Sequence, residues 1–287
     1  MNFYRLSDYL FAALQYILPH HLLSLLMLAL TRWKNRVFLN QFTPWFIEHY
    51  KVDMTIAKNE DWRSYTSFND FFTRAIKPQY RPICTEENIA SPVDACVSQA
   101  TNIDNGVIIQ AKNHHYSVQT LLGNYADDAQ QFNNGHFSTL YLSPKDYHRI
   151  HMPVDGKLIK VIHVPGRLFS VNPATARTIP RLFARNERVV CLFETELGSM
   201  AVVMVGAIFV ASIETVWQGV ITPPTRFAVR SWNYNEQQIC FKRGDEIARF
   251  NMGSTVILLF GENKISWNDD LTAEKNIIMG ESIGKIN

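Results

Sequence analysis

The sequence predicts an α+β protein in which a helical N-terminal region is followed by a mainly antiparallel β sandwich or barrel-like core. Between residues 37 and 82, aromatic and aliphatic residues recur at three- and four-residue spacing, which is typical of helices. After Pro82 the chain changes to short runs rich in valine and isoleucine, separated by glycine, proline or asparagine, which indicate strands. With 287 residues, 47% of them hydrophobic, the chain is long enough to bury such a core.

The first two helices are predicted at residues 9–18 and 22–31. No Asp, Glu, Lys or Arg occurs from Tyr9 to Thr31, so this is the one stretch that suggests a membrane span. Pro19 and the two histidines after it interrupt the stretch. Each half would cover about 15 Å as a helix, which is half of the roughly 30 Å of bilayer hydrocarbon. We therefore expect two short helices that lie in the membrane interface.

The charge of the N-terminal region agrees with this interpretation. Residues 1–36 contain four basic residues against one acidic residue, and an anionic leaflet attracts such an excess by about 1 kcal/mol per basic residue near its surface. We predict that residues 1–36 form a membrane-associating unit and that residues 37–287 form the main domain. The alternative is that these helices pack on the protein's own core or form a dimer contact. We expect no secretory signal, because Asp8 interrupts its basic start.

Residues 37–82 are predicted to be mostly helical, with Ser67 and Asn69 as candidate N-caps. The strand-forming runs behind them are VIIQA, FSTLYL, KLIKVIHV, RVVCLF, MAVVMVGAIFVASIETVW, QICF, EIARF and TVILLF. The segments SPVDACVSQ and MPVDGKLIKV indicate a repeated strand–turn–strand unit. Biotinyl and lipoyl carrier domains contain similar turns, but here Asp-Ala and Asp-Gly occupy the positions where a carrier needs lysine.

Composition and motifs exclude several classes of protein. The balance of 28 basic against 26 acidic residues gives no basic face for nucleic acid. The four cysteines include no C-x-x-C pair, which favours reduced thiols over a disulfide framework or a zinc ribbon. The sequence contains no G-x-G-x-x-G, P-loop, H-E-x-x-H or G-x-S-x-G motif.

Two short segments could carry chemistry. His148 and His151 lie three residues apart in YHRIH; a histidine pair is half a zinc site at best, so we predict no metal. Packing and acid–base chemistry both remain open for this pair, because histidine titrates near neutrality. Gly253-Ser254 precedes TVILLF, but Gly198-Ser199 also precedes a strand-forming run, and spacing alone does not separate the two.

Taken together, these segments resemble the bacterial phosphatidylserine decarboxylase family. The resemblance runs from about residue 9 to about residue 262. It is carried by YILPHHLLS, YKVDM, FNDFFTRAIKPQYRPI, SPVDACVSQ, YHRIHMPVDG, PGRLFSVNPATA, LFARNERVVCLFET, SIETVWQGVITPP and MGSTVILLF. It implies a proenzyme that cuts itself and makes its own cofactor.

The family's cleavage motif, Leu-Gly-Ser-Thr, corresponds to MGST at 252–255. Methionine for leucine is a nearly isovolume change that leaves the Gly–Ser bond unaltered. We reject LGSM at 197–200, because it lacks the threonine and the C-terminal location. Cutting would give a chain of residues 1–253 and a chain of residues 254–287. The small chain should stay attached, since each large side chain of TVILLF contributes about 1.5–3 kcal/mol when buried.

The resemblance assigns Asp94, His151 and Ser254 to a serine-protease-like triad. Ser254 Oγ would attack the carbonyl carbon of Gly253, His151 would take its proton, and Asp94 would hold the imidazole in the required tautomer. Elimination across Ser254 would then release the carboxylate of residue 253, and hydrolysis of the dehydroalanine left behind would lose ammonia and give a pyruvoyl group derived from Ser254. Ala95 stands where members commonly have glycine, which costs roughly 1 kcal/mol or more if the turn needs a positive φ.

The resemblance also implies the reaction. The pyruvoyl group would form a Schiff base with the amine of phosphatidylserine and accept electrons as CO₂ departs, and His148 would reprotonate the carbanion to give phosphatidylethanolamine. The expected location is peripheral, at the cytoplasmic face of the cell membrane. The expected partners are phosphatidylserine in the bilayer, the two chains of one precursor and a possible homodimer. The alternative is a serine hydrolase that uses the same triad on an external ester.

Overall fold

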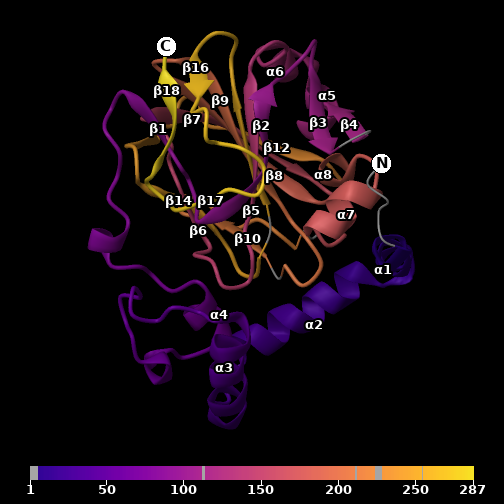
Figure 1. Cartoon of the computed structure of the whole chain (residues 1–287), viewed down its shortest axis with the longest axis vertical. Helices are drawn as coiled ribbons and strands as arrows, with labels where there is room; N and C mark the ends of the chain where they lie inside the picture. Colours follow the sequence, from indigo (N-terminus) through magenta and orange to yellow (C-terminus); the bar gives the residue numbers. More distant parts are fainter. Residues whose placement is uncertain (1–5, 112–113, 211, 224–227, 254) are drawn as a thin grey trace.

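The structure is a computed structural model that describes residues 6–111, 114–210, 212–223, 228–253 and 255–287. It has a helical part, residues 6–80, and a β body, residues 88–286. The helices lie along one side of the β body (Figure 1). The cut predicted from the sequence falls where the chain enters a strand of the β body, and Ser254 itself lies outside the described residues.

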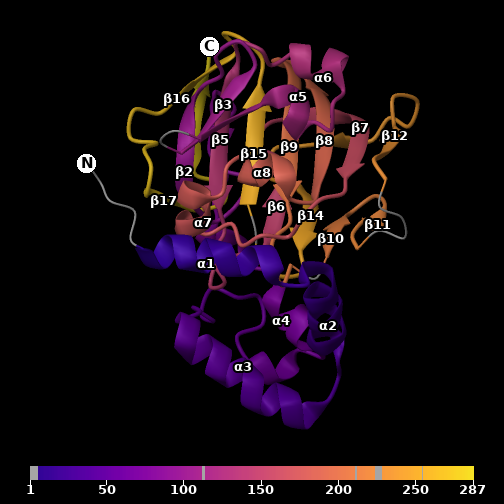
Figure 2. The same ribbon diagram turned by 90° about the vertical axis from the view of Figure 1, so that its right-hand side faces the viewer.

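The helical part contains α1 (Leu6–Ile17), α2 (His20–Arg32), α3 (Arg36–Tyr50), η1 (Trp62–Ser64), α4 (Phe68–Phe72) and η2 (Pro78–Tyr80). α1 runs along the lower side of the β body, with α3 and α4 below it (Figure 2). Ser67 caps α4 by accepting a hydrogen bond from the backbone N–H of Asp70, as predicted. Asn69 lies inside this helix, so the prediction of a cap there is wrong: the N-cap is two residues earlier, at Ser67, which already satisfies a free N–H group.

α1 and α2 meet at an angle of 84° at the predicted break. Buried His20 accepts a hydrogen bond on Nδ1 from the backbone N–H of Leu168 at 3.4 Å. Gln15 Oε1 accepts another from the backbone N–H of Ser170 at 3.0 Å. One face of these helices therefore packs on the protein's own body. Within the described residues, no helix is by itself long and apolar enough to cross a bilayer, and α1 with α2 reach that length only as this bent pair.

The β body is built on a nine-stranded antiparallel sheet in the order β12-β7-β8-β9-β15-β5-β2-β17, with β13 also paired to β7. Its strands are β2 (Ala95–Asn102), β5 (His136–Tyr141), β7 (Gly156–Val164), β8 (Arg188–Thr195), β9 (Gly198–Val205), β12 (Arg230–Asn233), β13 (Cys240–Phe241), β15 (Thr255–Phe260) and β17 (Asn276–Ile277). No sheet of the described residues closes into a barrel, and the predicted α+β class is confirmed.

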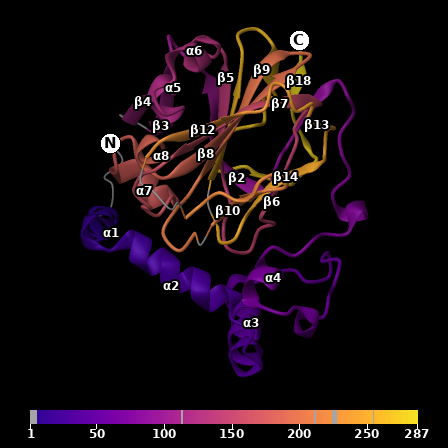
Figure 3. The ribbon, with the colours of Figure 1, turned by 180° about the vertical axis from the view of Figure 1, so that it is seen from behind.

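Three smaller sheets and four short helices complete the body. The sheet β11-β10-β14-β6 contains β6 (Arg149–His151), β10 (Ile213–Thr215), β11 (Gly219–Val220) and β14 (Glu246–Phe250). The others join β1 (Asn88–Ala90), β18 (Ser282–Ile286) and β16 (Ile265–Trp267), and β3 (Val107–Ala111) with β4 (His114–Ser117). The helices are α5 (Val118–Leu121), α6 (Ala126–Gln130), α7 (Pro173–Thr178) and α8 (Leu182–Arg185). Seen from behind, α1 and α2 run beneath these sheets (Figure 3).

β15 is an inner strand of the large sheet. All six of its residues are fully buried, and it pairs over its whole length with β5 on one side and β9 on the other. The strand predicted from TVILLF is therefore confirmed. The predicted run from 200 to 217 is instead split, because β9 ends at Val205 and the next strand, β10, begins only at Ile213. All four cysteines are free, as expected.

Candidate active site

His148 faces the predicted cleavage point. It is completely buried and directly precedes β6, and its carbonyl accepts a hydrogen bond from the backbone N–H of Phe250 on β14 at 3.0 Å. Its Nδ1 lies 2.8 Å from the carbonyl oxygen of Asp146. Because a carbonyl oxygen only accepts, Nδ1 carries the proton and Nε2 presents a lone pair. A Cβ atom added to Gly253 would lie 3.1 Å from this Nε2.

The Nε2 atom of His148 is buried and has no hydrogen-bond partner among the described residues. Burial lowers the pKa of this imidazole from 6.5 to about 3; the bond to the Asp146 carbonyl partly opposes this, and the Arg74 guanidinium adds to it. The ring is therefore neutral near pH 7, with its free lone pair directed at Gly253. An unpartnered buried polar atom is costly, which is characteristic of a reaction site.

His151 has a different environment. Its Nδ1 donates to the carbonyl oxygen of Gly244 at 2.7 Å, so its Nε2 accepts a hydrogen bond from the hydroxyl of Tyr147 at 3.0 Å. Burial lowers its pKa as well. In the sheet, the backbone of His151 pairs with Glu246, the first residue of β14, whereas Phe250 is the last residue of that strand.

Asp94 is held by partners other than His151. Arg81 binds both of its carboxylate oxygens, through Nε at 2.8 Å and through Nη2, and the backbone N–H of Met279 donates to Oδ1 at 2.8 Å. The hydrogen bond predicted between Asp94 and His151 does not occur among the described residues. Ala95 has a negative φ and begins β2, so the strain that alanine would bring there does not arise.

The structure therefore brings His148 and Gly253 together, while Asp94 and His151 are each engaged elsewhere and Ser254 lies outside the described residues. The roles given to these residues stay predictions. Sequence reasoning missed Tyr147 and Arg81, although both lie inside segments that carry the family resemblance, YHRIH and RPI. In the described part of the chain, no group of three or more His, Cys, Asp or Glu side chains could hold a metal ion.

A pocket of about 430 Å³ opens between the helical part and the strand ends. Its wall is mainly apolar and reaches the cleavage point; it includes Leu14, Phe46, Phe72, Leu142, Met252 and Gly253. Gln15, Tyr50 and Ser170 add polar groups. Such a site suits a molecule with an apolar chain and a polar end that reacts next to residue 253.

Comparison with known proteins decides the family. A family model described as phosphatidylserine decarboxylase matches residues 68–285, and a second, described as PSD, matches residues 10–51. The chain belongs to the phosphatidylserine decarboxylase family. A family member from Shewanella sp. (strain ANA-3), named phosphatidylserine decarboxylase proenzyme, is 52% identical over 279 residues, which are 96% of each chain. One of the same name from Shewanella loihica is 50% identical over 284 residues, 97% of this chain and 99% of its own.

These relatives cover both parts of the structure. The decarboxylase model begins at Phe68, the first residue of α4, and continues through the whole β body. The second model covers α1, α2 and α3, apart from the first residues of α1. The relatives from Shewanella match 96–97% of this chain, so they share the helical part as well as the β body.

Proposed function

We propose that this chain cuts itself between Gly253 and Ser254 and then decarboxylates phosphatidylserine to phosphatidylethanolamine and CO₂. The family and its proenzyme relatives support this activity. The observation that carries the proposal is the position of His148 Nε2, which has no hydrogen-bond partner among the described residues and faces Gly253 beside an apolar pocket. The alternative, a serine hydrolase acting on an external ester, is not favoured, since relatives that match almost the whole chain are decarboxylase proenzymes.

The proposed cut requires a proton acceptor for the Ser254 hydroxyl. We assign this role to His151 with Asp94, as the family resemblance implies. For His151 to act, its Nε2 must exchange the hydroxyl of Tyr147 for that of Ser254. Asp94 must turn from Arg81 toward His151. Glycine at 253 fits the reaction because a side chain there would crowd His148 Nε2 and the Leu142 carbonyl oxygen, 3.3 Å from the added Cβ.

The cofactor of the proposed reaction is a pyruvoyl group made from Ser254. Such a group supplies a ketone that condenses with the substrate amine and an electron sink for the carbon that loses CO₂. The residues around it fit this chemistry. The wall of the pocket is mainly apolar, and neutral His148 stands next to the site, where its Nε2 can accept a proton and then pass it to the reacting carbon.

The experiment that tests the function is intact-mass spectrometry of the purified protein, before and after treatment with a hydrazine. We expect two polypeptides, residues 1–253 and 254–287, which co-migrate under native conditions. We expect the hydrazine to add mass to the small chain only and to stop CO₂ release from phosphatidylserine vesicles. An uncut chain would contradict the proposal, and so would a small chain that begins with serine and does not react with the hydrazine. The native mass also tests the homodimer that the resemblance implies.

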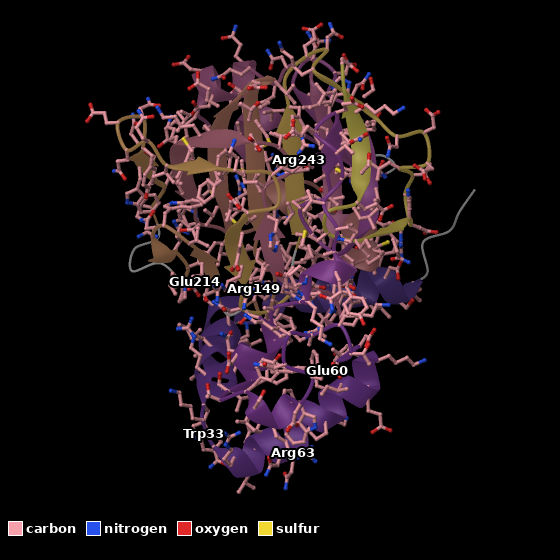
Figure 4. The ribbon with its side chains drawn as sticks, turned by 90° about the vertical axis from the view of Figure 1, so that its left-hand side faces the viewer. Trp33, Glu60, Arg63, Arg149, Glu214 and Arg243 are labelled. Carbon is pink, nitrogen blue, oxygen red and sulfur yellow. The ribbon has the colours of Figure 1, made fainter. Side chains whose placement is uncertain are left out.

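We further propose that the protein is peripheral at the cytoplasmic face of the cell membrane, with the helical part as its contact. The outer face of α1 and α2 is apolar: Leu10 is 63% exposed, Ile17 78% and Leu26 59%. Trp33, which follows α2, is half-exposed and lies on the side of the helical part away from the β body (Figure 4). Apolar and aromatic groups of this kind insert among lipid headgroups.

Replacing Leu10, Ile17 and Leu26 with glutamate is expected to reduce the fraction of protein that floats with anionic liposomes by about tenfold or more, because each change puts a charge into the lipid interface. The matched control replaces Val107, Val220 and Ile278, three half-exposed residues of the β body, with glutamate. Flotation should be unchanged in the control. Equal flotation of both variants would rule out this contact surface.

A further inference from the structure

Phe72, the last residue of α4, packs against the ring of His148. The two ring centroids are 4.2 Å apart and the planes are inclined by 39°. Phe72 is 1% exposed, and its side chain also lines the pocket that reaches Gly253. The histidine that faces the cleavage point is therefore covered by a side chain of the helical part.

Two further contacts fix the end of α4 to the segment that contains His148. Arg149 Nε donates to the carbonyl oxygen of Thr73 at 2.8 Å, and Arg74 Nη2 donates to the carbonyl oxygen of Lys145 at 3.1 Å. Arg149 lies at the boundary between the helical part and the β body (Figure 4). These two hydrogen bonds connect the residues that follow α4 to the chain on both sides of His148.

The other side of the cleavage point contacts the same helices. Phe72 belongs to a second, small hydrophobic core that α3 and α4 form with Val52 and Tyr65. Met252, the residue before Gly253, packs against this core. The helical part therefore contacts both His148 and the bond to be cut.

We infer that Phe72 is a positioning residue: its ring holds the imidazole of His148 with Nε2 toward Gly253 and keeps water away from it. The bond from Nδ1 to the Asp146 carbonyl restrains only one edge of the imidazole. The torsion that turns an imidazole about its Cβ–Cγ bond is broad, so a flat neighbour is needed to fix the ring. Through α4, the helices that we propose for membrane contact thereby form part of the reaction site.

This inference predicts how His148 titrates. Burial is the largest cause of its lowered pKa. The charge of Arg74, which follows α4, lowers the pKa further, whereas the hydrogen bond from Nδ1 to the backbone carbonyl of Asp146 raises it. Removing the Phe72 ring would admit water and stabilise the protonated imidazole, so the pKa should rise toward 6.5.

The test compares Phe72→Leu with Phe68→Leu. Phe68 lies on the same helix and is also fully buried, but its ring contacts are Phe42, Phe46, Phe71 and Phe72. Both changes are made in the uncut Ser254→Ala chain, and the His148 ring is titrated by NMR, with its signal assigned by its loss in His148→Gln. We expect Phe72→Leu to raise the pKa of His148 by about one unit or more. Phe68→Leu should leave the pKa of His148 unchanged. Phe72→Tyr, which keeps an aromatic ring at this position, should also leave it close to the value in the Ser254→Ala chain.

The measurement of decarboxylase activity rests on the proposed function, whereas the NMR titration of His148 does not. In the cut enzyme, Phe72→Leu should lower kcat by about tenfold and move the acid limb of the pH profile upward, with little change in KM. Phe68→Leu should lose a similar amount of thermal stability and keep the wild-type pH profile. Equal effects of the two changes on the pKa, or none from Phe72→Leu, would overturn the inference. A raised pKa in a protein with no decarboxylase activity would instead refute the function alone.

Discussion

Replacing Ser254 with alanine is expected to leave the whole chain uncut and without decarboxylase activity. The change removes the hydroxyl that attacks the Gly253 carbonyl and also the atoms from which the pyruvoyl group is made, so no slower route through the same residue remains. Denaturing electrophoresis should show one polypeptide of 287 residues, and intact-mass spectrometry should give the mass of the unprocessed variant.

The sequence offers a matched control for this change. Ser199 follows Gly198, as Ser254 follows Gly253, but Gly198 and Ser199 begin β9 directly after the turn from β8, and Gly198 has a φ of 89°. Ser199→Ala should therefore cut and decarboxylate normally. Cutting of Ser254→Ala, or its loss in Ser199→Ala, would mean that the reacting bond lies elsewhere.

His148→Asn is expected to produce a chain that cuts itself but decarboxylates about 10²- to 10⁴-fold more slowly. The asparagine side-chain N–H₂ can replace Nδ1 as donor to the Asp146 carbonyl, so the segment before β6 should keep its position. What is lost is the nitrogen that faces Gly253, which we expect to take up the proton that the substrate ammonium gives up before it attacks the ketone and to return this proton to the substrate carbon. The measurement is CO₂ release per mole of cut enzyme.

His151→Asn provides the contrast. We expect it to remain uncut, because the base that activates Ser254 is then missing. The geometry makes this pair of variants decisive, since His148 and not His151 already points at Gly253. If His148→Asn stayed uncut and His151→Asn cut normally, the base for self-cleavage would be His148, and the assigned roles would have to be exchanged.

The elements that could be predicted from sequence are those that depend on local pattern. TVILLF, the cap at Ser67 and the break at Pro19 each follow from neighbouring residues, and the structure has all three. The order of strands could not be predicted. β15 pairs with β5, more than a hundred residues earlier in the chain, and no local pattern specifies that register.

The candidate site could be predicted only in part, because the fold and not the local pattern decides which side chains meet. Histidines three residues apart along an extended chain point to opposite faces, so only one of the pair can meet Gly253, and the sequence does not say which. The partners of Asp94 and His148 come from distant segments. Arg81 forms an ion pair with Asp94, and the ring of Phe72 packs on the imidazole of His148. The spacing of these residues in the sequence does not predict either contact.

The inner position of β15 has a consequence for the order of events in the life of this protein. The strand starts immediately after the bond to be cut, and β14, which leads to that bond, is hydrogen-bonded to the backbone of His148. Assembly of these strands must therefore precede the chemistry, and a molecule that stalls during folding stays inert. After the proposed cut, β15 would stay hydrogen-bonded between β5 and β9. Only correctly folded copies would then acquire the reactive end, and no copy could exchange this segment with another without unfolding.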